Sequence, residues 1–165
     1  LVPYNDNFSE NIKNLEFDAV FLSNGPGDPR IVKNIDNIII DFAKENYPII
    51  GICFGHQLIG KAFNLEIEKL PFGHHGGNHP VKELSTGKVF ITSQNHNYAI
   101  SMKSFQSNPD WELTWLHLYD NTVSGIKHKY LPIYSVQFHP EASPGPNDAN
   151  KFIFDCFFNT VKNNA

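Results

Sequence analysis

The sequence predicts an α/β protein with a mostly parallel sheet flanked by helices and a β-rich C-terminal half. Two observations carry this prediction. Between residues 17 and 64, continuous apolar runs alternate with segments whose apolar residues recur at helical spacing, which is typical of a parallel sheet covered on both faces. After Asn64, short β-like runs separated by turn residues take over, and only the end of the chain returns to a helical pattern.

The first half contains two predicted strand–helix pairs. Residues 17–24 form a continuous apolar run, as expected of a buried strand. Asp28 is a good helix N-cap and Pro29 a good first helical residue, so we expect a helix to begin here. The apolar residues of 31–46 recur at helical spacing, so we expect this helix to bury one face. The second strand and the second helix are predicted over 47–54 and 55–64.

Five β-like runs and one helix make up the rest of the chain. The final helix, over 146–164, is amphipathic, with Asn147 as a candidate N-cap. No repeat or linker interrupts the 165 residues, so we expect one domain over 1–165. Because "LVPYN" is typical of the end of a strand, we expect this domain to be truncated at its N-terminus. The β-like runs are residues 65–72, 88–95, 112–119, 122–129 and 131–138.

Composition and charge exclude several classes of function. A net charge of −4 and a pI near 6.0 give no basic surface for nucleic acid or for an anionic membrane. No apolar run approaches the roughly 20 residues that span a bilayer. A disulfide between Cys53 and Cys156 in a secreted protein is one interpretation, but neither spacing nor a signal peptide favours it. We therefore expect a reduced, cytoplasmic setting, with Cys156 as a small buried apolar residue.

The pentapeptide Gly51-Ile52-Cys53-Phe54-Gly55 lies where a predicted strand meets a predicted helix. Glycines on both sides of a cysteine are typical of a nucleophile elbow, a tight turn that presents the nucleophile above the sheet. At the helix N-terminus, the dipole and free N–H groups are expected to favour thiolate over thiol. A buried structural cysteine beside helix-packing glycines is the alternative, and this segment alone does not separate the two.

A thiolate nucleophile needs a base and a proton donor, and "SVQFHPEA" supplies the best candidate among eight histidines. Proline keeps His139 out of the helical region, and an extended backbone would project His139 and Glu141 to the same side. A carboxylate beside an imidazole fixes its tautomer and stabilises the imidazolium. A surface His–Glu pair is the more common interpretation of His-x-Glu alone.

Together these segments resemble the Cys-His-Glu triad of class I glutamine amidotransferases, whose fold is a flavodoxin-like parallel sheet. "GICFGHQ" and "QFHPEA" carry the triad, and "LSNGPGDP" resembles the oxyanion strand loop of that family. Three further stretches, "PFGHHGGNHPV", "ITSQNHNYAI" and "HPEASPGPNDA", are similar to the glutaminase domain of glutamine-dependent carbamoyl-phosphate synthetase. The resemblance covers nearly the whole chain.

The resemblance implies a role for each matching residue. Cys53 is expected to be the nucleophile, His139 the general base and acid, and Glu141 the group that orients His139. Where the family usually has Gly after "QNH" and then Phe, this chain has Asn97 and Tyr98, so it departs from the family pattern at both positions. The remaining expected residues are oxyanion donors at Gly25 and Phe54, and glutamine contacts at Gly27, Gln57, Asn95, Asn97 and Tyr98.

The implied activity is hydrolysis of L-glutamine to glutamate through a cysteinyl thioester. The ammonia would travel through a channel to a carbamoyl-phosphate synthetase large subunit or a fused synthetase domain. That partner would make carbamoyl phosphate from bicarbonate and ATP, for pyrimidine or arginine synthesis. "GPGDP" lacks the Lys-Ser/Thr ending of a phosphate-binding loop, so ATP and Mg are expected on the partner, with no cofactor in this domain. Neither nucleic acid nor membrane is an expected partner.

Three alternative interpretations compete with this activity. "HHGGNH" places His74, His75 and His79 close together in sequence, as in a zinc site, but a flexible Gly-Gly between them favours a structural or partner-docking loop, with no metal. A cysteine peptidase or deglycase on a similar elbow would have no use for the "QNHNY" segment. A catalytically inactive domain is disfavoured because Cys53, His139 and Glu141 are all present.

Overall fold

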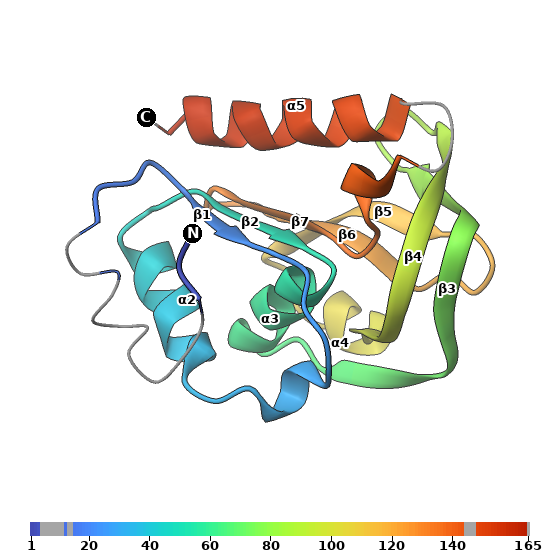
Figure 1. The fold of residues 1–165 in the computed structure, drawn as a ribbon, viewed down its shortest axis with the longest axis horizontal. Helices are drawn as coiled ribbons and strands as arrows, with labels where there is room; N and C mark the ends of the chain where they lie inside the picture. The colour runs from blue at the N-terminus through green and yellow to red at the C-terminus, as the bar shows by residue number, and fades with distance from the viewer. Residues whose placement is uncertain (4–11, 13–14, 144–147, 165) are drawn as a thin grey trace.

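The computed structural model describes residues 1–3, 12, 15–143 and 148–164. A mixed seven-stranded sheet forms its centre, in the order β1-β2-β7-β6-β5-β3-β4 (Figure 1). The predicted α/β class is confirmed. The strands are β1 (Val20–Leu22), β2 (Ile49–Ile52), β3 (Ile67–Glu83), β4 (Val89–Ile100), β5 (Trp111–His117), β6 (Val123–His128) and β7 (Ile133–Val136).

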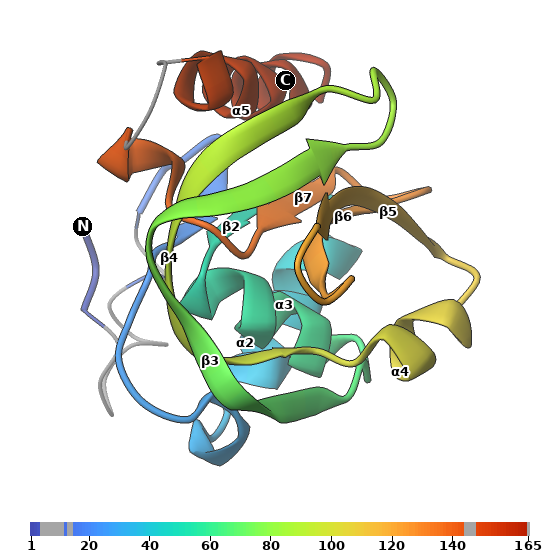
Figure 2. The same ribbon diagram turned by 90° about the vertical axis from the view of Figure 1, so that its right-hand side faces the viewer.

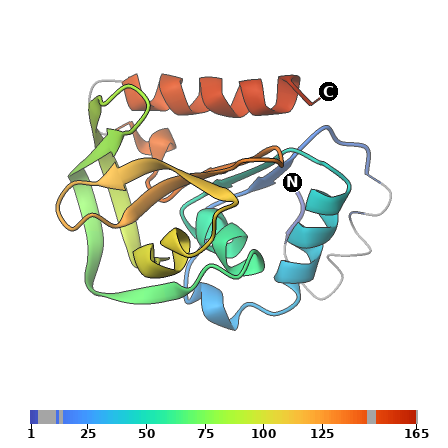
Figure 3. The same ribbon diagram turned by 180° about the vertical axis from the view of Figure 1, so that it is seen from behind.

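The parallel part of the sheet, β1-β2-β7, has helices on both faces. Helices α2 (Ile35–Lys44) and α3 (Phe54–Ala62) lie on one face, and α5 (Asp148–Lys162) lies on the other (Figures 1 and 3). Side chains alternate along a strand, so Ile49 packs with the α2–α3 core while Ile50 packs with the α5 core. Burial on both faces explains why β2 is a continuous apolar run.

The antiparallel part holds the β-rich half of the chain. Strands β3 and β4 form a long twisted ribbon that runs from beside α5 to beside α4 (Met102–Gln106), as Figure 2 shows. Strands β5 and β6 lie between this ribbon and β7. Trp115 of β5 is fully buried, and its indole N–H donates to the hydroxyl of Tyr134 at 2.8 Å. This contact links the antiparallel strands to β7.

Two predicted elements differ from the structure. The helix expected over 31–46 is split into a short 3₁₀ helix, η1 (Pro29–Ile31), and α2. Asp28 does cap η1 by accepting from the backbone N–H of Arg30 at 2.9 Å. Asn34, in the left-handed conformation with φ 66°, then turns the chain before α2 begins. The predicted cap at Asp28 is therefore confirmed, but it caps the short helix η1 and not the longer helix that was expected.

The loop expected at "HHGGNH" is instead part of β3. The strand continues through it in register with β4, with shifts between Lys69 and His74 and between Gly76 and His79. Gly73 and Gly76 have φ of 66° and 133°, and such left-handed glycines allow a bulge without ending the pairing. A flexible docking loop is therefore wrong for this segment.

Several expectations concern the ends of the chain. The candidate cap Asn147 lies outside the described residues, and α5 begins at Asp148. Leu1–Pro3 are not in a strand, and the remainder of "LVPYN" lies outside the described residues.

Within the described ranges, no helix combines the length and apolar character needed to cross a bilayer. The short helix α4 was not predicted.

Candidate active site

Cys53 occupies a strained turn between β2 and α3. Its backbone has φ 52° and ψ −100°, a conformation that L side chains rarely adopt and that clusters at functional sites. A Cβ on Gly55 would lie 2.1 Å from the carbonyl oxygen of Leu22, and one on Gly51 would lie 2.8 Å from the backbone of Gly55. Both positions therefore require glycine, as the elbow interpretation expects.

The Cys53 side chain is almost fully buried, at 4% exposure. Its thiol donates to the carbonyl of Asn95 at 3.9 Å and accepts from the amide of Gln137 at 3.7 Å. Burial raises the pKa of Cys53 to about 11, although the Phe54 N–H and the Gln137 amide act in the opposite direction. The expected preference for thiolate is thus outweighed by desolvation, and the resting group is a thiol.

His139 and Cys53 lie at the same edge of the sheet because β2 and β7 are parallel neighbours. Cys53 directly follows β2 and His139 lies just beyond β7, and the carboxyl ends of parallel strands share one edge of the sheet. The backbone N–H of Cys53 donates to Val136 O at 2.9 Å, which fixes the elbow to β7. The backbone N–H of His139 donates to Ser93 O at 2.9 Å, which ties β4 to the same edge.

Glu141 determines which nitrogen of His139 carries the proton. A carboxylate oxygen of Glu141 lies 2.8 Å from His139 Nδ1, and a carboxylate can only accept, so Nδ1 is the N–H. In the neutral imidazole, Nε2 is then the nitrogen with the lone pair. It is buried and has no hydrogen-bond partner among the described residues, which leaves it available as a base.

The expected oxyanion residues also lie at this edge. A Cβ on Gly25 would be 3.2 Å from the ring of Phe54, so the segment after β1 packs against the first residue of α3. Gly27 has φ 98°, which glycine adopts readily. The structure thus brings Gly25 and Phe54 together, and their N–H donor roles stay predictions.

The expected glutamine-contact residues of β4 lie beside Cys53. The carbonyl of Asn95 faces the thiol, and the side chains of Asn95 and Asn97 are exposed. His75 of β3 bridges them, with Nδ1 at 3.0 Å from Asn95 Oδ1 and Nε2 at 3.1 Å from Asn97 Oδ1. The Tyr98 ring lies under the Arg30 guanidinium at 4.9 Å. These glutamine contacts stay predictions.

Gln57, which was expected to contact glutamine, is buried in the structure. It is 2% exposed, and its amide nitrogen donates to Tyr98 O at 2.7 Å and to Gln137 Oε1 at 3.1 Å. Two protein acceptors therefore already use its N–H groups.

Sequence reasoning missed His75, Arg30 and Gln137 at this site. Only Gln137 had a signal in the sequence, because it lies two residues before His139 and so shares its side of an extended segment.

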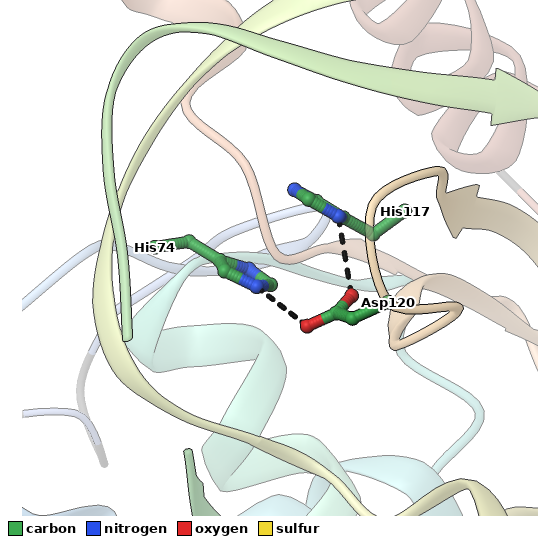
Figure 4. Close-up of side chains that lie close together, drawn as sticks. All are labelled: His74, His117 and Asp120. Carbon is green, nitrogen blue, oxygen red and sulfur yellow. Dashed lines mark hydrogen bonds and ion pairs between the residues drawn. The ribbon is translucent and has the colours of Figure 1, made fainter. Parts of the chain in front are cut away.

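The histidines considered for zinc do not gather as one set. His75 faces the two asparagines, whereas His74, His117 and Asp120 form a separate trio whose ligand atoms lie within 4.8 Å of one another. His79 lies beside this trio, with its Nδ1 at 3.1 Å from His117 Nε2. Asp120 contacts His74 Nε2 at 2.8 Å and His117 Nδ1 at 3.2 Å (Figure 4). The two rings are stacked at 4.0 Å with an interplanar angle of 12°. The ring lone pairs of stacked imidazoles lie in parallel planes, so they do not converge on one metal ion. The trio therefore fits a polar contact between β3 and the β5–β6 turn better than a metal site.

Fold and site together define an α/β protein with a cysteine nucleophile elbow and a His–Glu pair at the carboxyl edge of its parallel strands. Comparison with known families agrees: residues 1–160 match the model "Glutamine amidotransferase class-I". The chain belongs to the class I glutamine amidotransferase family.

Curated relatives of the chain are longer proteins. The carbamoyl phosphate synthase small chain of Aquifex aeolicus (strain VF5) is 55% identical over 144 residues, which are 87% of this chain and 38% of that protein. The carbamoyl phosphate synthase pyrimidine-specific small chain of Bacillus subtilis (strain 168) is 48% identical over 162 residues, 98% of this chain and 43% of that protein. The chain therefore spans less than half the length of these relatives.

Solved structures share the fold. A crystal structure of a protein from Thermoplasma acidophilum, described as part of a GMP synthase, superposes with a TM-score of 0.74 at 25% sequence identity. The match covers 94% of this chain and 77% of that one.

Proposed function

We propose that this chain hydrolyses the side-chain amide of L-glutamine and supplies ammonia for carbamoyl phosphate synthesis. The observation that carries the proposal is the free Nε2 of His139, held in its tautomer by Glu141, at the same sheet edge as the elbow cysteine. Family membership supports the amide substrate, and about half-identical relatives named as carbamoyl phosphate synthase small chains support the use of the ammonia.

The first half-reaction forms a thioester. His139 Nε2 takes the proton of the Cys53 thiol, and the sulfur attacks the δ-carbonyl carbon of glutamine. The oxygen becomes an oxyanion, which the N–H groups of Gly25 and Phe54 receive; each such donor is worth about 3 kcal/mol. The imidazolium then gives its proton to the departing nitrogen, so the C–N bond breaks and ammonia leaves.

The second half-reaction regenerates the thiol. His139 Nε2 takes a proton from water, and the hydroxide attacks the thioester carbonyl at the same oxyanion position. The C–S bond breaks, glutamate leaves, and the proton returns to the sulfur. Glu141 stabilises the imidazolium at both stages, because its carboxylate accepts from Nδ1. Asn95, Tyr98 and Gly27 would hold the amino-acid end of the substrate.

The partner proposal follows from the chemistry of ammonia. A separate large subunit or a fused synthetase domain would receive ammonia through a channel and would carry the ATP and Mg. Pyrimidine synthesis is one destination, as the name of the Bacillus subtilis relative suggests, and arginine synthesis is the other. A cytoplasmic location would suit this role.

The test is trapping of the nucleophile. We expect a glutamine-analogue electrophile such as diazo-oxo-norleucine to add one label at Cys53 and none at Cys156, both of which are free thiols. Free glutamine should protect Cys53, and Cys53→Ser should release no glutamate. Cys156→Ser is the matched control and should keep full activity. Equal labelling of both cysteines, or glutamate release by Cys53→Ser, would reject the proposal, and cleavage of peptides instead of glutamine would favour a peptidase.

A further inference from the structure

Three buried side-chain amide contacts lead from Tyr98 of β4 to Cys53. Gln57 Nε2 donates to the backbone carbonyl of Tyr98 at 2.7 Å and to Gln137 Oε1 at 3.1 Å. Gln137 Nε2 in turn donates to Cys53 Sγ at 3.7 Å. Gln57 and Gln137 are 2% and 1% exposed, so water does not compete for these contacts.

The direction of these hydrogen bonds is fixed at the Tyr98 end. Amide oxygen and nitrogen are normally assigned from the network, but a backbone carbonyl can only accept. Gln57 must therefore present its nitrogen to Tyr98, and that same nitrogen faces Gln137. Gln137 must therefore accept this hydrogen bond with its amide oxygen, so its N–H groups lie on the side of Cys53.

We propose that Gln137 is a further catalytic residue, whose amide N–H donates to Cys53 Sγ and stabilises the thiolate as His139 removes the proton. The role rests on the proposed function. The nucleophile is 4% exposed, so water does little to solvate a negative sulfur there, and a fixed donor replaces it. A contact that is long to a neutral thiol shortens and strengthens when the acceptor becomes charged. Gln57 is the positioning residue, because it holds Gln137 in the donating orientation.

The test measures thiolate formation without glutamine. Iodoacetamide alkylation of Cys53 is followed against pH in a Cys156→Ser background, so that one thiol reports. In Gln137→Met, which keeps the length and removes the donor, we expect alkylation at neutral pH to slow about tenfold and the pH profile to move upward, as for loss of one hydrogen bond to a charged group. Gln137→Glu keeps the acceptor for Gln57 but places an acceptor or a negative charge at the sulfur. It should slow alkylation further.

Ser135→Ala is the matched control. Ser135 lies two residues earlier, is fully buried, and contacts His56 Nδ1 at 2.9 Å instead of Cys53. The pH profile of Cys53 alkylation in Ser135→Ala should match that of the parent chain. An unchanged profile in Gln137→Met, or an equal shift in Ser135→Ala, would overturn the proposal; if Gln137→Met does not fold, Gln137→Glu decides by the same criterion.

Glutamine turnover separates this inference from the proposed function. Gln137→Met should lower kcat with KM nearly unchanged, because the thiolate forms after substrate binds. Absence of turnover in the parent chain, together with an alkylation shift in Gln137→Met, would reject the glutaminase role and keep the thiolate contact. Normal turnover in the parent, with no alkylation shift in the variant, would reject only the role of Gln137.

Discussion

His139 Nδ1 and a carboxylate oxygen of Glu141 lie 2.8 Å apart, although only Pro140 separates the two residues. An extended backbone was expected to bring them together, but residues Pro140–Ala142 form a 3₁₀ helix. Proline fits the first position of such a turn, and the tight turn folds the carboxylate back onto the imidazole. The side-by-side placement is as predicted, and its local cause is different.

The first prediction concerns this contact. Glu141→Gln keeps the size of the side chain but removes the charge that stabilises the imidazolium. Because the carboxylate is 44% exposed and acts through His139, we expect kcat for glutamine hydrolysis to fall about tenfold to a hundredfold, at or below the lower end of general acid–base effects. KM should change less. Glu112→Gln, an exposed position on β5, is the control, and a change confined to KM would make Glu141 a substrate contact instead.

The second prediction concerns the elbow. Gly55→Ala would place a Cβ 2.1 Å from Leu22 O and 2.7 Å from its carbonyl carbon, and backbone atoms cannot yield as a side chain does. We expect the free energy of unfolding to fall by about 3 kcal/mol or more, as in other overpacked cores. Gly87→Ala has φ 72° but its nearest neighbour is Lys82 Cε at 4.0 Å, so it should cost only about 1–2 kcal/mol of backbone strain. Urea unfolding compares the two, and equal costs would show that crowding at Gly55 is not decisive.

Local patterns in the sequence predicted the elbow around Cys53, the His139–Glu141 pair and the strand–helix alternation of the parallel core. Neither the elbow nor the pair alone assigned a catalytic role, and those roles came from the family resemblance. The elbow depends on Gly51 and Gly55, which are close neighbours of Cys53 in the chain, whereas the pairing of β2 with β7 is long-range and was not predicted. The pairing of β3 with β4 across "HHGGNH" was not predictable, since two glycines in a polar segment are also typical of a loop.

Long-range contacts were also beyond the sequence. His75 meets Asn95 and Asn97 only because two strands pair, and Gln137 meets Gln57 only after β7 and α3 pack. The raised pKa of Cys53 likewise depends on how tightly these elements close over it, whereas a helix N-terminus considered alone predicts the opposite direction.

The third prediction concerns Asn97, where the resembled family usually has glycine. The Asn97 side chain is exposed and points its Oδ1 at His75 Nε2, 3.1 Å away, which is the β3 side of the strand. If backbone groups of this segment hold glutamine, Asn97→Gly should change kcat/KM by no more than about twofold, the scale of a surface substitution within about 0.5 kcal/mol. Asn95→Ala, next to the carbonyl that faces Cys53, is the comparison and should be more harmful. A larger loss in Asn97→Gly than in Asn95→Ala would make the Asn97 side chain a substrate contact.

The last prediction concerns buried histidines and acid stability. Burial lowers the pKa of His56 and of His96 to about 3 and that of His117 to about 4. Unfolded histidines take up protons below about pH 6.5, whereas these three stay neutral in the folded chain until the pH nears 3 to 4. Their contribution is therefore present above pH 6.5 and is lost as the pH falls toward the folded values, at up to about 1.4 kcal/mol per pH unit for each group.

His56→Gln should reduce the pH slope of the unfolding free energy between pH 6 and pH 4 by about the contribution of one proton. Ser135→Ala removes the hydrogen bond to His56 Nδ1 but keeps the imidazole, so it should lower stability without changing that slope. Urea unfolding across this pH range makes the comparison, and an unchanged slope in His56→Gln would mean that His56 gains a proton in the folded chain as readily as in the unfolded one.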